Sequence, residues 1–259
     1  MPTFASDLLA GRVALVTGGG VGIGRAVALS MAAAGARVAV GARDLARARE
    51  VAEQCGEGSV AVALDVTDEA SCRDAVARLE SEPGGLDALV NNAGVASSSK
   101  FTDLDDETWE WVLGVNLTGA FRMIRAALPA MLERGRGRIV SVASTAGHRG
   151  SPYVAAYTAS KHGLLGLTRS LSAEYARSGV TFNCVCPGYV DTPMTERTVA
   201  NISARTGRSH EEAERALHTP QGRLVDPREV ADLCVYLASD AAASVNGQAI
   251  VVDGGGVQA

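Results

Sequence analysis

The chain has 259 residues, of which 47% are hydrophobic and 20% are charged, and its formal net charge is -5. This composition is typical of a globular protein, and the acidic balance argues against nucleic acid or an anionic membrane as a partner. Residues 1–259 are long enough to form one large α/β domain, and we expect a single domain.

Seven short β-branched runs alternate with longer helical patterns along the chain. Apolar strands that alternate with helices are typical of a parallel sheet covered on both faces. We therefore predict an α/β fold with a doubly wound, Rossmann-type parallel sheet of about seven strands. The predicted strands cover residues 12–17, 37–41, 60–65, 87–91, 138–143, 180–185 and 248–252.

A glycine-rich segment, TGGGVGIGRA at residues 17–26, follows the first predicted strand and leads into a predicted helix. Glycine tolerates positive φ and lets backbone N–H groups approach a ligand, and a helix N-terminus carries a partial positive charge. Gly18, Gly22 and Gly24 therefore predict a site for the pyrophosphate of a dinucleotide. A simple glycine-rich turn is the alternative, but the place between strand and helix is the one that the binding mechanism requires.

The second predicted strand ends in VGARD, residues 40–44. Ala42 stands where a dinucleotide fold would carry an acid for the ribose 2′-hydroxyl, and Arg43 follows, where it could bind a 2′-phosphate. This favours NADP (NADPH) over NAD. Asp44 would oppose this preference unless it caps the next helix, as we expect. The alternative for Arg43 is a solvated surface charge.

Five cysteines, an odd number, show neither a disulfide framework nor the spacing of a metal site. Cys184 and Cys186 lie two residues apart near a predicted strand, which is more typical of a buried pair than of ligands. The four histidines show no metal spacing either, so we expect no metal. A reducing cytoplasm is the expected location, and no segment reaches the roughly 20 apolar residues that cross a bilayer.

One connection departs from the pattern. Residues 193–224 are polar, helical in parts, and far longer than the two to six residues usual between a strand and a helix. Long ordered loops often cover binding sites. We predict that this segment is an inserted helical lid over a substrate.

The stretch AAYTASKHG, residues 155–163, places Tyr157 four residues before Lys161. At this spacing the two side chains share one helix face, about one turn apart. Taken alone, the pair is more typical of an amphipathic helix with a half-buried tyrosine and a lysine whose ammonium reaches solvent.

Several motifs occur together and in a familiar order. The chain resembles the short-chain dehydrogenase/reductase family essentially from end to end, and most of all its 3-oxoacyl thioester (acyl carrier protein) reductases and aromatic polyketide ketoreductases. The motifs that carry the resemblance are TGGGVGIG (17–24), LDV (64–66), NNAG (91–94), Asn116 in VNLTG, Ser144 in SVAST, YTASK (157–161), PGYVDTPM (187–194) and VDGG (252–255).

The resemblance implies a set of contacts with NADP. It implies that Asp65 and Val66 flank the adenine and that Val190 and Thr192 contact the nicotinamide carboxamide and nearby phosphates. Val21 departs from the pattern, since NADP-preferring relatives often carry a basic residue there. The implied cofactor residues are Thr17, Gly18, Gly22, Ile23, Gly24, Arg43, Asp65, Val66, Asn92, Ala93, Gly94, Tyr157, Lys161, Pro187, Gly188, Val190 and Thr192.

The same resemblance gives the tyrosine and lysine a chemical role. Reduction of a ketone needs a proton donor with a pKa near the working pH, and free tyrosine, at about 10, is too weak an acid. We expect the Lys161 ammonium and the oxidised nicotinamide to lower the pKa of Tyr157, the general acid/base, and Lys161 to bind the nicotinamide ribose. Ser144 would hold the substrate carbonyl, and Asn116 would link Lys161 to solvent through a water molecule.

The expected activity is NADPH-dependent reduction of a ketone to a secondary alcohol, with a small ketone or an acyl thioester on acyl carrier protein or CoA as substrate. The alternatives are an NAD(P)-dependent alcohol or sugar dehydrogenase working oxidatively, and an NADP(H)-binding sensor without turnover. Relatives are commonly tetramers, so a homotetramer joined through helices around 105–127 and 157–177 is expected. Arg134, Arg136 and Arg177 would dock a carrier protein, unless they are ordinary solvated charges.

Overall fold

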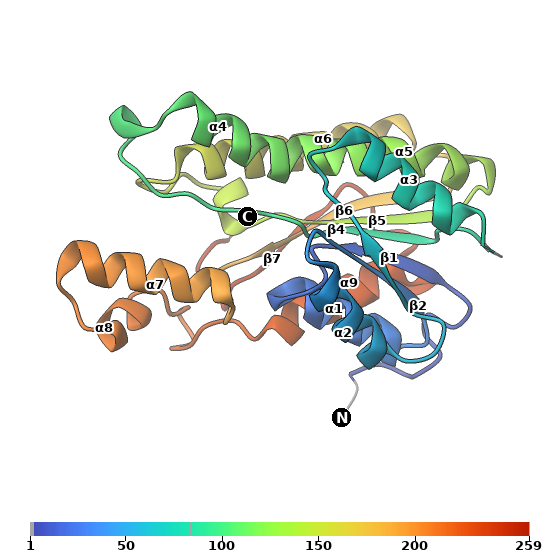
Figure 1. The fold of residues 1–259 in the computed structure, drawn as a ribbon, viewed down its shortest axis with the longest axis horizontal. Helices are drawn as coiled ribbons and strands as arrows, with labels where there is room; N and C mark the ends of the chain where they lie inside the picture. Colours follow the sequence, from blue (N-terminus) through green and yellow to red (C-terminus); the bar gives the residue numbers. More distant parts are fainter. Residues whose placement is uncertain (1–2, 83, 259) are drawn as a thin grey trace.

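The fold is seen in a computed structural model that describes residues 3–82 and 84–258 (Figure 1). Seven parallel strands form one sheet in the order β3-β2-β1-β4-β5-β6-β7, which confirms the predicted α/β architecture. The strands are β1 (Val13–Thr17), β2 (Arg37–Ala42), β3 (Val60–Ala63), β4 (Ala88–Asn91), β5 (Gly137–Val142), β6 (Val180–Pro187) and β7 (Ala249–Val252).

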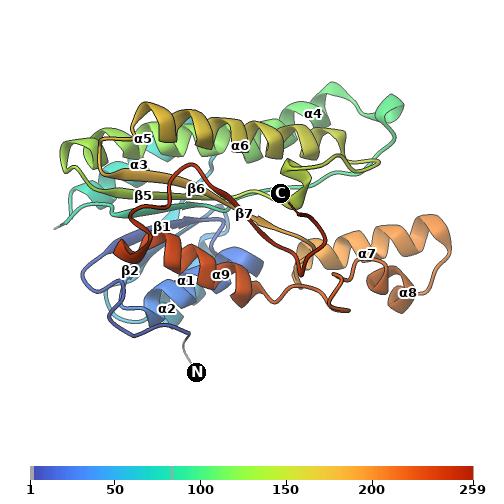
Figure 2. The ribbon, with the colours of Figure 1, turned by 180° about the vertical axis from the view of Figure 1, so that it is seen from behind.

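Helices cover both faces of the sheet (Figures 1 and 2). One layer holds α1 (Gly22–Ala33), α2 (Leu45–Cys55) and α9 (Pro227–Ala238), and the other holds α3 (Glu69–Glu80), α4 (Asp106–Leu113), α5 (Gly119–Glu133) and α6 (Ala155–Glu174). Short helical turns are η1 (Phe101–Asp103), η2 (Gly114–Thr118), η3 (Thr145–Gly147) and η4 (Asp240–Ala242).

Two hydrophobic cores lie on opposite faces of the sheet. Side chains alternate along a strand, so Ala14 and Val16 pack into the core beneath α1 and α9, whereas Leu15 packs into the core beneath α3 and α5. This double burial explains why the strands are almost continuously apolar in the sequence.

The strand order reverses between β1 and β4. After β1 the chain builds β2 and β3 on one side, and it then returns to place β4 on the other side of β1. Ligands of doubly wound sheets bind at such a switch point, outside the carboxyl ends of the strands. Thr17 and Asn91 end the two strands that flank this position.

The cysteines behave as apolar side chains, as predicted. Cys184 and Cys186 are fully buried in β6, and all five cysteines are free thiols. Within residues 3–82 and 84–258, no cluster of three metal-binding side chains occurs. Over the same ranges, no helix combines the length and apolar character needed to cross a membrane.

The long polar connection after β6 folds into two helices, α7 (Pro193–Thr206) and α8 (His210–Arg215), which extend from one end of the sheet (Figures 1 and 2). Val199, Ala213 and Leu217 form a small core of their own between them. The helical content predicted for residues 193–224 is present. Coverage of a substrate by this segment stays a prediction.

Local sequence explains the ends of these two helices. The Thr192 hydroxyl caps α7, and Gly207 ends that helix with a left-handed φ of 72°. Ser209 and Glu212 form a reciprocal capping box at the start of α8.

Candidate active site

Two hydroxyl groups meet beyond the carboxyl end of β5. Ser144 is buried, and its side chain caps η3 by accepting a hydrogen bond of 3.1 Å from the Ala146 backbone N–H. Tyr157 lies in the first turn of α6, and a side-chain hydrogen bond joins it to Ser144. The two hydroxyls can therefore bind one substrate oxygen together.

Lys161 lies one helical turn after Tyr157, as the spacing predicts. Its side chain is only 4% exposed, and Nζ lies 5.5 Å from the centroid of the Tyr157 ring. Nζ donates a hydrogen bond of 2.9 Å to the carbonyl oxygen of Val142, the last residue of β5. Burial lowers the pKa of Lys161 from 10.5 to about 8, because desolvation penalises the ammonium.

The pKa of Tyr157 contradicts one sequence-based expectation. Burial of the phenol raises this pKa, and the hydrogen bond from Ser144 opposes the rise. The expectation that Lys161 lowers the pKa is wrong for this structure, since desolvation is the main cause and Nζ is directed to the Val142 carbonyl.

Asn116 is almost completely buried, with 2% exposure, in the π-helical turn η2. Its Oδ1 accepts a hydrogen bond of 2.8 Å from the Val95 N–H, and its Nδ2 donates to the Val95 carbonyl at 2.9 Å. The side chain thus fixes the segment that follows β4. A water-mediated link from Asn116 to Lys161 stays a prediction.

Sequence reasoning missed Ser160. Its hydroxyl donates to the Tyr157 carbonyl oxygen at 2.7 Å and accepts from Asn116 Nδ2 at 3.1 Å. Ser160 therefore ties the helix of Tyr157 and Lys161 to the buried asparagine. A small polar residue directly before the lysine, on a helix otherwise well packed, was the available signal.

The glycine-rich loop has the shape that a pyrophosphate requires. Gly18 and Gly22 adopt left-handed φ values of 65° and 54°. A Cβ on Gly24 would lie 2.3 Å from the Gly18 carbonyl oxygen, so no larger residue fits there. The N-terminus of α1, after Val21, has no side-chain cap and no acidic residue in its first turn. Its free N–H groups and partial positive charge fit a dinucleotide phosphate.

Hydrogen bonds hold the NNAG segment against this loop. Thr17 Oγ1 accepts hydrogen bonds of 3.0 Å from the backbone N–H groups of Asn92 and Ala93. Asn92 Nδ2 donates to the carbonyl oxygens of Thr17 and Gly18 at 3.0 and 3.2 Å. A Cβ on Gly94 would lie 3.9 Å from Lys161 Nζ. The segment therefore connects the predicted cofactor cleft to Lys161.

At the end of β2, Asp44 is a helix cap, as predicted. Asp44 caps α2 by accepting from the Arg47 N–H at 3.2 Å, and its carboxylate forms an ion pair with Arg47 Nε. Arg43 is exposed and helps to lower the pKa of Asp65, for which hydrogen bonds from Thr67 are the main cause. The Asp44 carboxylate is thus engaged at the start of α2, and Arg43 is the exposed cation beside it.

The end of β6 approaches the glycine-rich loop from the other side. A Cβ on Gly22 would lie 3.3 Å from Thr192 Cγ2, and Val190 is buried in an isolated parallel bridge with Val225. Pro187 ends β6. The next residue, Gly188, lies close to Asp253, since a Cβ on Gly188 would be 2.9 Å from Asp253 Cβ. Ile23 and Val66 pack against the two cores. Cofactor contacts by these residues stay predictions.

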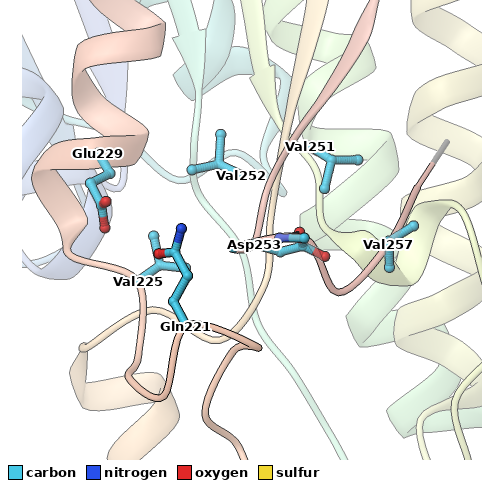
Figure 3. Close-up of a pocket in the computed structure, with 9 residues that line it drawn as sticks. Gln221, Val225, Glu229, Val251, Val252, Asp253 and Val257 are labelled. Atoms are coloured by element: carbon cyan, nitrogen blue, oxygen red, sulfur yellow. Dashed lines mark hydrogen bonds between the residues drawn. The ribbon is translucent and has the colours of Figure 1, made fainter.

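A separate pocket lies outside the group of candidate catalytic residues. A pocket of about 310 Å³ adjoins β7 and the start of α9 (Figure 3), and its walls include Gln221, Glu229 and Asp253. Ser144, Tyr157 and Lys161 do not line it. A smaller cavity lies at the carboxyl ends of β1, β4 and β5, and its walls include Thr17, Asn91, Asn116 and Val142.

The predicted basic patch before β5 is largely neutralised. Arg134 forms an ion pair with Glu80 and donates to the Leu86 carbonyl oxygen at 2.8 Å, and Arg136 forms an ion pair with the buried Asp87. These contacts favour the alternative in which the arginines serve local structure.

Comparisons with known proteins agree with this geometry. A family described as enoyl-(acyl carrier protein) reductase matches residues 19–256. A 3-oxoacyl-[acyl-carrier-protein] reductase of Vibrio harveyi is 37% identical over 247 residues, which cover 95% of this chain and 98% of that protein. The D-beta-hydroxybutyrate dehydrogenase of Cupriavidus necator is 39% identical over 258 residues, covering 96% and 99%.

A solved structure shares the fold over nearly its full length. This is a variant of the actinorhodin polyketide ketoreductase with NADPH, which has a TM-score of 0.90 and 40% sequence identity and covers 97% of this chain and 98% of that chain. The matches extend across the glycine-rich loop, α6 and the segment after β6. The chain is therefore an oxidoreductase that belongs to the short-chain dehydrogenase/reductase family.

Proposed function

We propose that the protein uses NADPH to reduce the ketone of a 3-oxoacyl thioester or a polyketide-like carbonyl to a secondary alcohol. The observation that carries this proposal is the meeting of Ser144, Tyr157 and Lys161 beside the glycine-rich loop. Relatives named for 3-oxoacyl and polyketide ketone reduction support the choice of substrate.

Each catalytic side chain has a defined task in this proposal. The Ser144 and Tyr157 hydroxyls hold the substrate oxygen, and Tyr157 donates the proton to it. The phenol is protonated at neutral pH, and because burial makes it a weaker acid, the Ser144 hydrogen bond that opposes the rise in its pKa favours proton donation. Lys161, with a pKa of about 8, exchanges protons near neutrality and can replace the proton that Tyr157 gives up. Bound NADPH supplies the hydride.

The preference for NADPH over NADH rests on Arg43. Its guanidinium is exposed near Asp65, whereas Asp44 is occupied by Arg47. A guanidinium forms charge-assisted hydrogen bonds with a phosphate, and the ribose 2′-phosphate is the group that distinguishes the two cofactors. The actinorhodin relative was solved with NADPH.

The remaining proposals concern location and partners. A cytoplasmic location fits the five free thiols. Substrate carriage by acyl carrier protein or CoA is suggested by the Vibrio relative's name alone. A homotetramer through helices around 105–127 and 157–177 is supported by the exposed side chains of Trp111 and Phe121. The helices of residues 193–224 would cover the substrate.

One alternative is oxidation of a secondary alcohol. It is supported by the relative named as a hydroxybutyrate dehydrogenase and by Lys161, which can accept a proton at a pH above about 8. A cofactor-binding sensor without turnover is less well supported, because it would not need Ser144, Tyr157 and Lys161 together.

The experiment is to mix the protein with NADPH and a panel of ketones, and to follow nicotinamide absorbance. We expect oxidation of NADPH with 3-oxoacyl thioesters at a higher kcat/KM than with simple cyclic ketones. NADP-dependent turnover of secondary alcohols alone would favour the oxidative alternative. Binding of NADPH with no turnover of any ketone or alcohol would favour the sensor.

A further inference from the structure

The first turn of α2 carries an arginine where two other helices of this chain carry a glutamate. Arg47 is the third residue of α2, and the corresponding residues of α8 and α9 are Glu212 and Glu229, which complete capping boxes. A cation in a first helical turn is disfavoured by the partial positive charge of the helix N-terminus. Helix stability therefore does not account for Arg47.

Arg47 engages both oxygens of the Asp44 carboxylate. Its backbone N–H donates to Oδ1 at 3.2 Å, and its Nε lies 3.2 Å from Oδ2. The side chains of Arg47 and Asp44 are 62% and 55% exposed, and an ion pair this exposed contributes little to stability. The pair therefore determines the position and the charge of the carboxylate more than it stabilises the fold.

The same turn lies beside the glycine-rich loop. A Cβ on Gly20 would be 3.3 Å from Arg47 Cβ, and a backbone hydrogen bond of 3.1 Å joins the loop to the end of β2. Asp44 directly follows Arg43, the residue proposed to bind the 2′-phosphate. These contacts put the Asp44 carboxylate next to the region where the ribose of a bound dinucleotide is expected.

A free carboxylate at this position would favour NADH over NADPH. An acid after the second strand can accept a hydrogen bond from the ribose 2′-hydroxyl of NADH, and its charge repels the 2′-phosphate of NADPH. Because Asp44 is paired with Arg47, its negative charge is compensated, and Arg43 supplies the remaining positive charge of residues 43–47.

We propose that Arg47 is a positioning residue for cofactor choice, because its ion pair with Asp44 neutralises a carboxylate that would otherwise favour NADH and repel NADPH. This inference rests on the proposed use of NADPH, and it adds a residue that needs no contact with the cofactor. The two arginines then have different tasks. Arg43 attracts the 2′-phosphate, and Arg47 compensates the charge of the acid that lies between them.

Direct binding of the phosphate by Arg47 is the competing explanation, and the substitution Asp44→Asn separates the two. An asparagine still caps the helix, but it carries no charge. If Arg47 acts through Asp44, it becomes dispensable once that charge is removed. If Arg47 binds the phosphate itself, it remains necessary.

The experiment is a double-mutant cycle measured by direct cofactor binding. Fluorescence titration at low ionic strength, where exposed charges are least screened, gives dissociation constants for NADPH and NADH without turnover. For Arg47→Gln, we expect affinity for NADPH to fall about threefold to tenfold, as for one uncompensated charge near a phosphate at the surface, and affinity for NADH not to fall. Combined with Asp44→Asn, the same substitution should change NADPH affinity less than about twofold.

Arg49→Gln is the matched control. Arg49 is exposed on the same helix, and its loss changes the net charge of the protein by the same amount. Because it lies two residues further along, it is on nearly the opposite side of α2 from Arg47. This variant should bind both cofactors like the wild type. Thermal unfolding of each variant verifies that it remains folded.

The possible failures are distinct from one another. Equal losses for the two cofactors with Arg47→Gln, no loss for either, or a loss that persists beside Asp44→Asn would overturn the role of Arg47 while the use of NADPH stands. A similar loss with Arg49→Gln would also overturn it. A wild-type protein that binds NADH more tightly than NADPH would remove the proposed cofactor, and this role of Arg47 with it.

Discussion

Lys161 Nζ donates its hydrogen bond to the carbonyl oxygen of Val142, at 2.9 Å, and so a buried cation is anchored on the last residue of β5. Desolvation destabilises the charged form of Lys161, and this lowers its pKa to about 8. The site therefore holds a lysine that changes its charge close to physiological pH.

The titration of Lys161 should be visible in the stability of the protein. Below pH 8 the lysine is charged in both states, and burial penalises the folded state. Between pH 8 and 10.5 the folded protein loses a proton that the unfolded chain keeps, so stability rises with pH. Relative to Lys161→Met, the wild-type free energy of unfolding should gain up to roughly 3 kcal/mol across this window. Urea unfolding at several pH values measures it, and a constant difference would contradict it.

Tyr157→Phe removes one hydroxyl from the site. Because the phenol is the proposed proton donor, turnover should fall about 100-fold to 10,000-fold, while NADPH binding survives. Steady-state kinetics and cofactor titration of the same preparation provide the two measurements. A variant that keeps most of the wild-type turnover would remove Tyr157 from the mechanism.

Arg43→Ala tests the choice of cofactor. The exposed guanidinium has no role in the fold that the structure reveals, so stability should hardly change. Affinity for NADPH should fall about tenfold to a hundredfold, the range for a lost charge-assisted hydrogen bond, and affinity for NADH should change little. Equal losses for the two cofactors would show that Arg43 does not bind the 2′-phosphate.

Gly24→Ala tests the close packing of the glycine-rich loop. The new Cβ would lie 2.3 Å from the Gly18 carbonyl oxygen and 2.4 Å from Asn92 Nδ2, so the loop must shift and cofactor affinity should fall at least tenfold. Gly20→Ala is the control, because its nearest neighbour would be Arg47 Cβ at 3.3 Å. Similar affinities for both variants would argue against a tightly shaped phosphate site.

The sequence was informative where local chemistry decides the structure. The strands were recognisable because both faces of the sheet are buried, and Asp44 was recognisable as a cap because its carboxylate reaches a backbone N–H three residues away. The tyrosine and lysine share a helix face because helical geometry requires it.

Long-range contacts were beyond such reasoning. The pKa of Tyr157 depends on burial by segments distant in the chain, so its direction could not be read from the neighbouring lysine. Arg134 and Arg136 looked like a free basic patch because their partners, Glu80 and Asp87, precede them by about fifty residues. Ser160 acquired its role only when Asn116 was brought beside it.

The uncapped N-terminus of α1 limits how far the thermal stability of this enzyme can be raised by design. Asp44, Asp68, Asp105 and Asp226 cap other helices with carboxylates, whereas Val21 caps nothing. Val21→Asp would add such a cap to α1 and about 0.5–2 kcal/mol of helix stability. The same carboxylate would accept hydrogen bonds from the N–H groups that are proposed to bind the cofactor phosphates, and it would repel those phosphates. A substitution that stabilises this helix would therefore weaken cofactor binding.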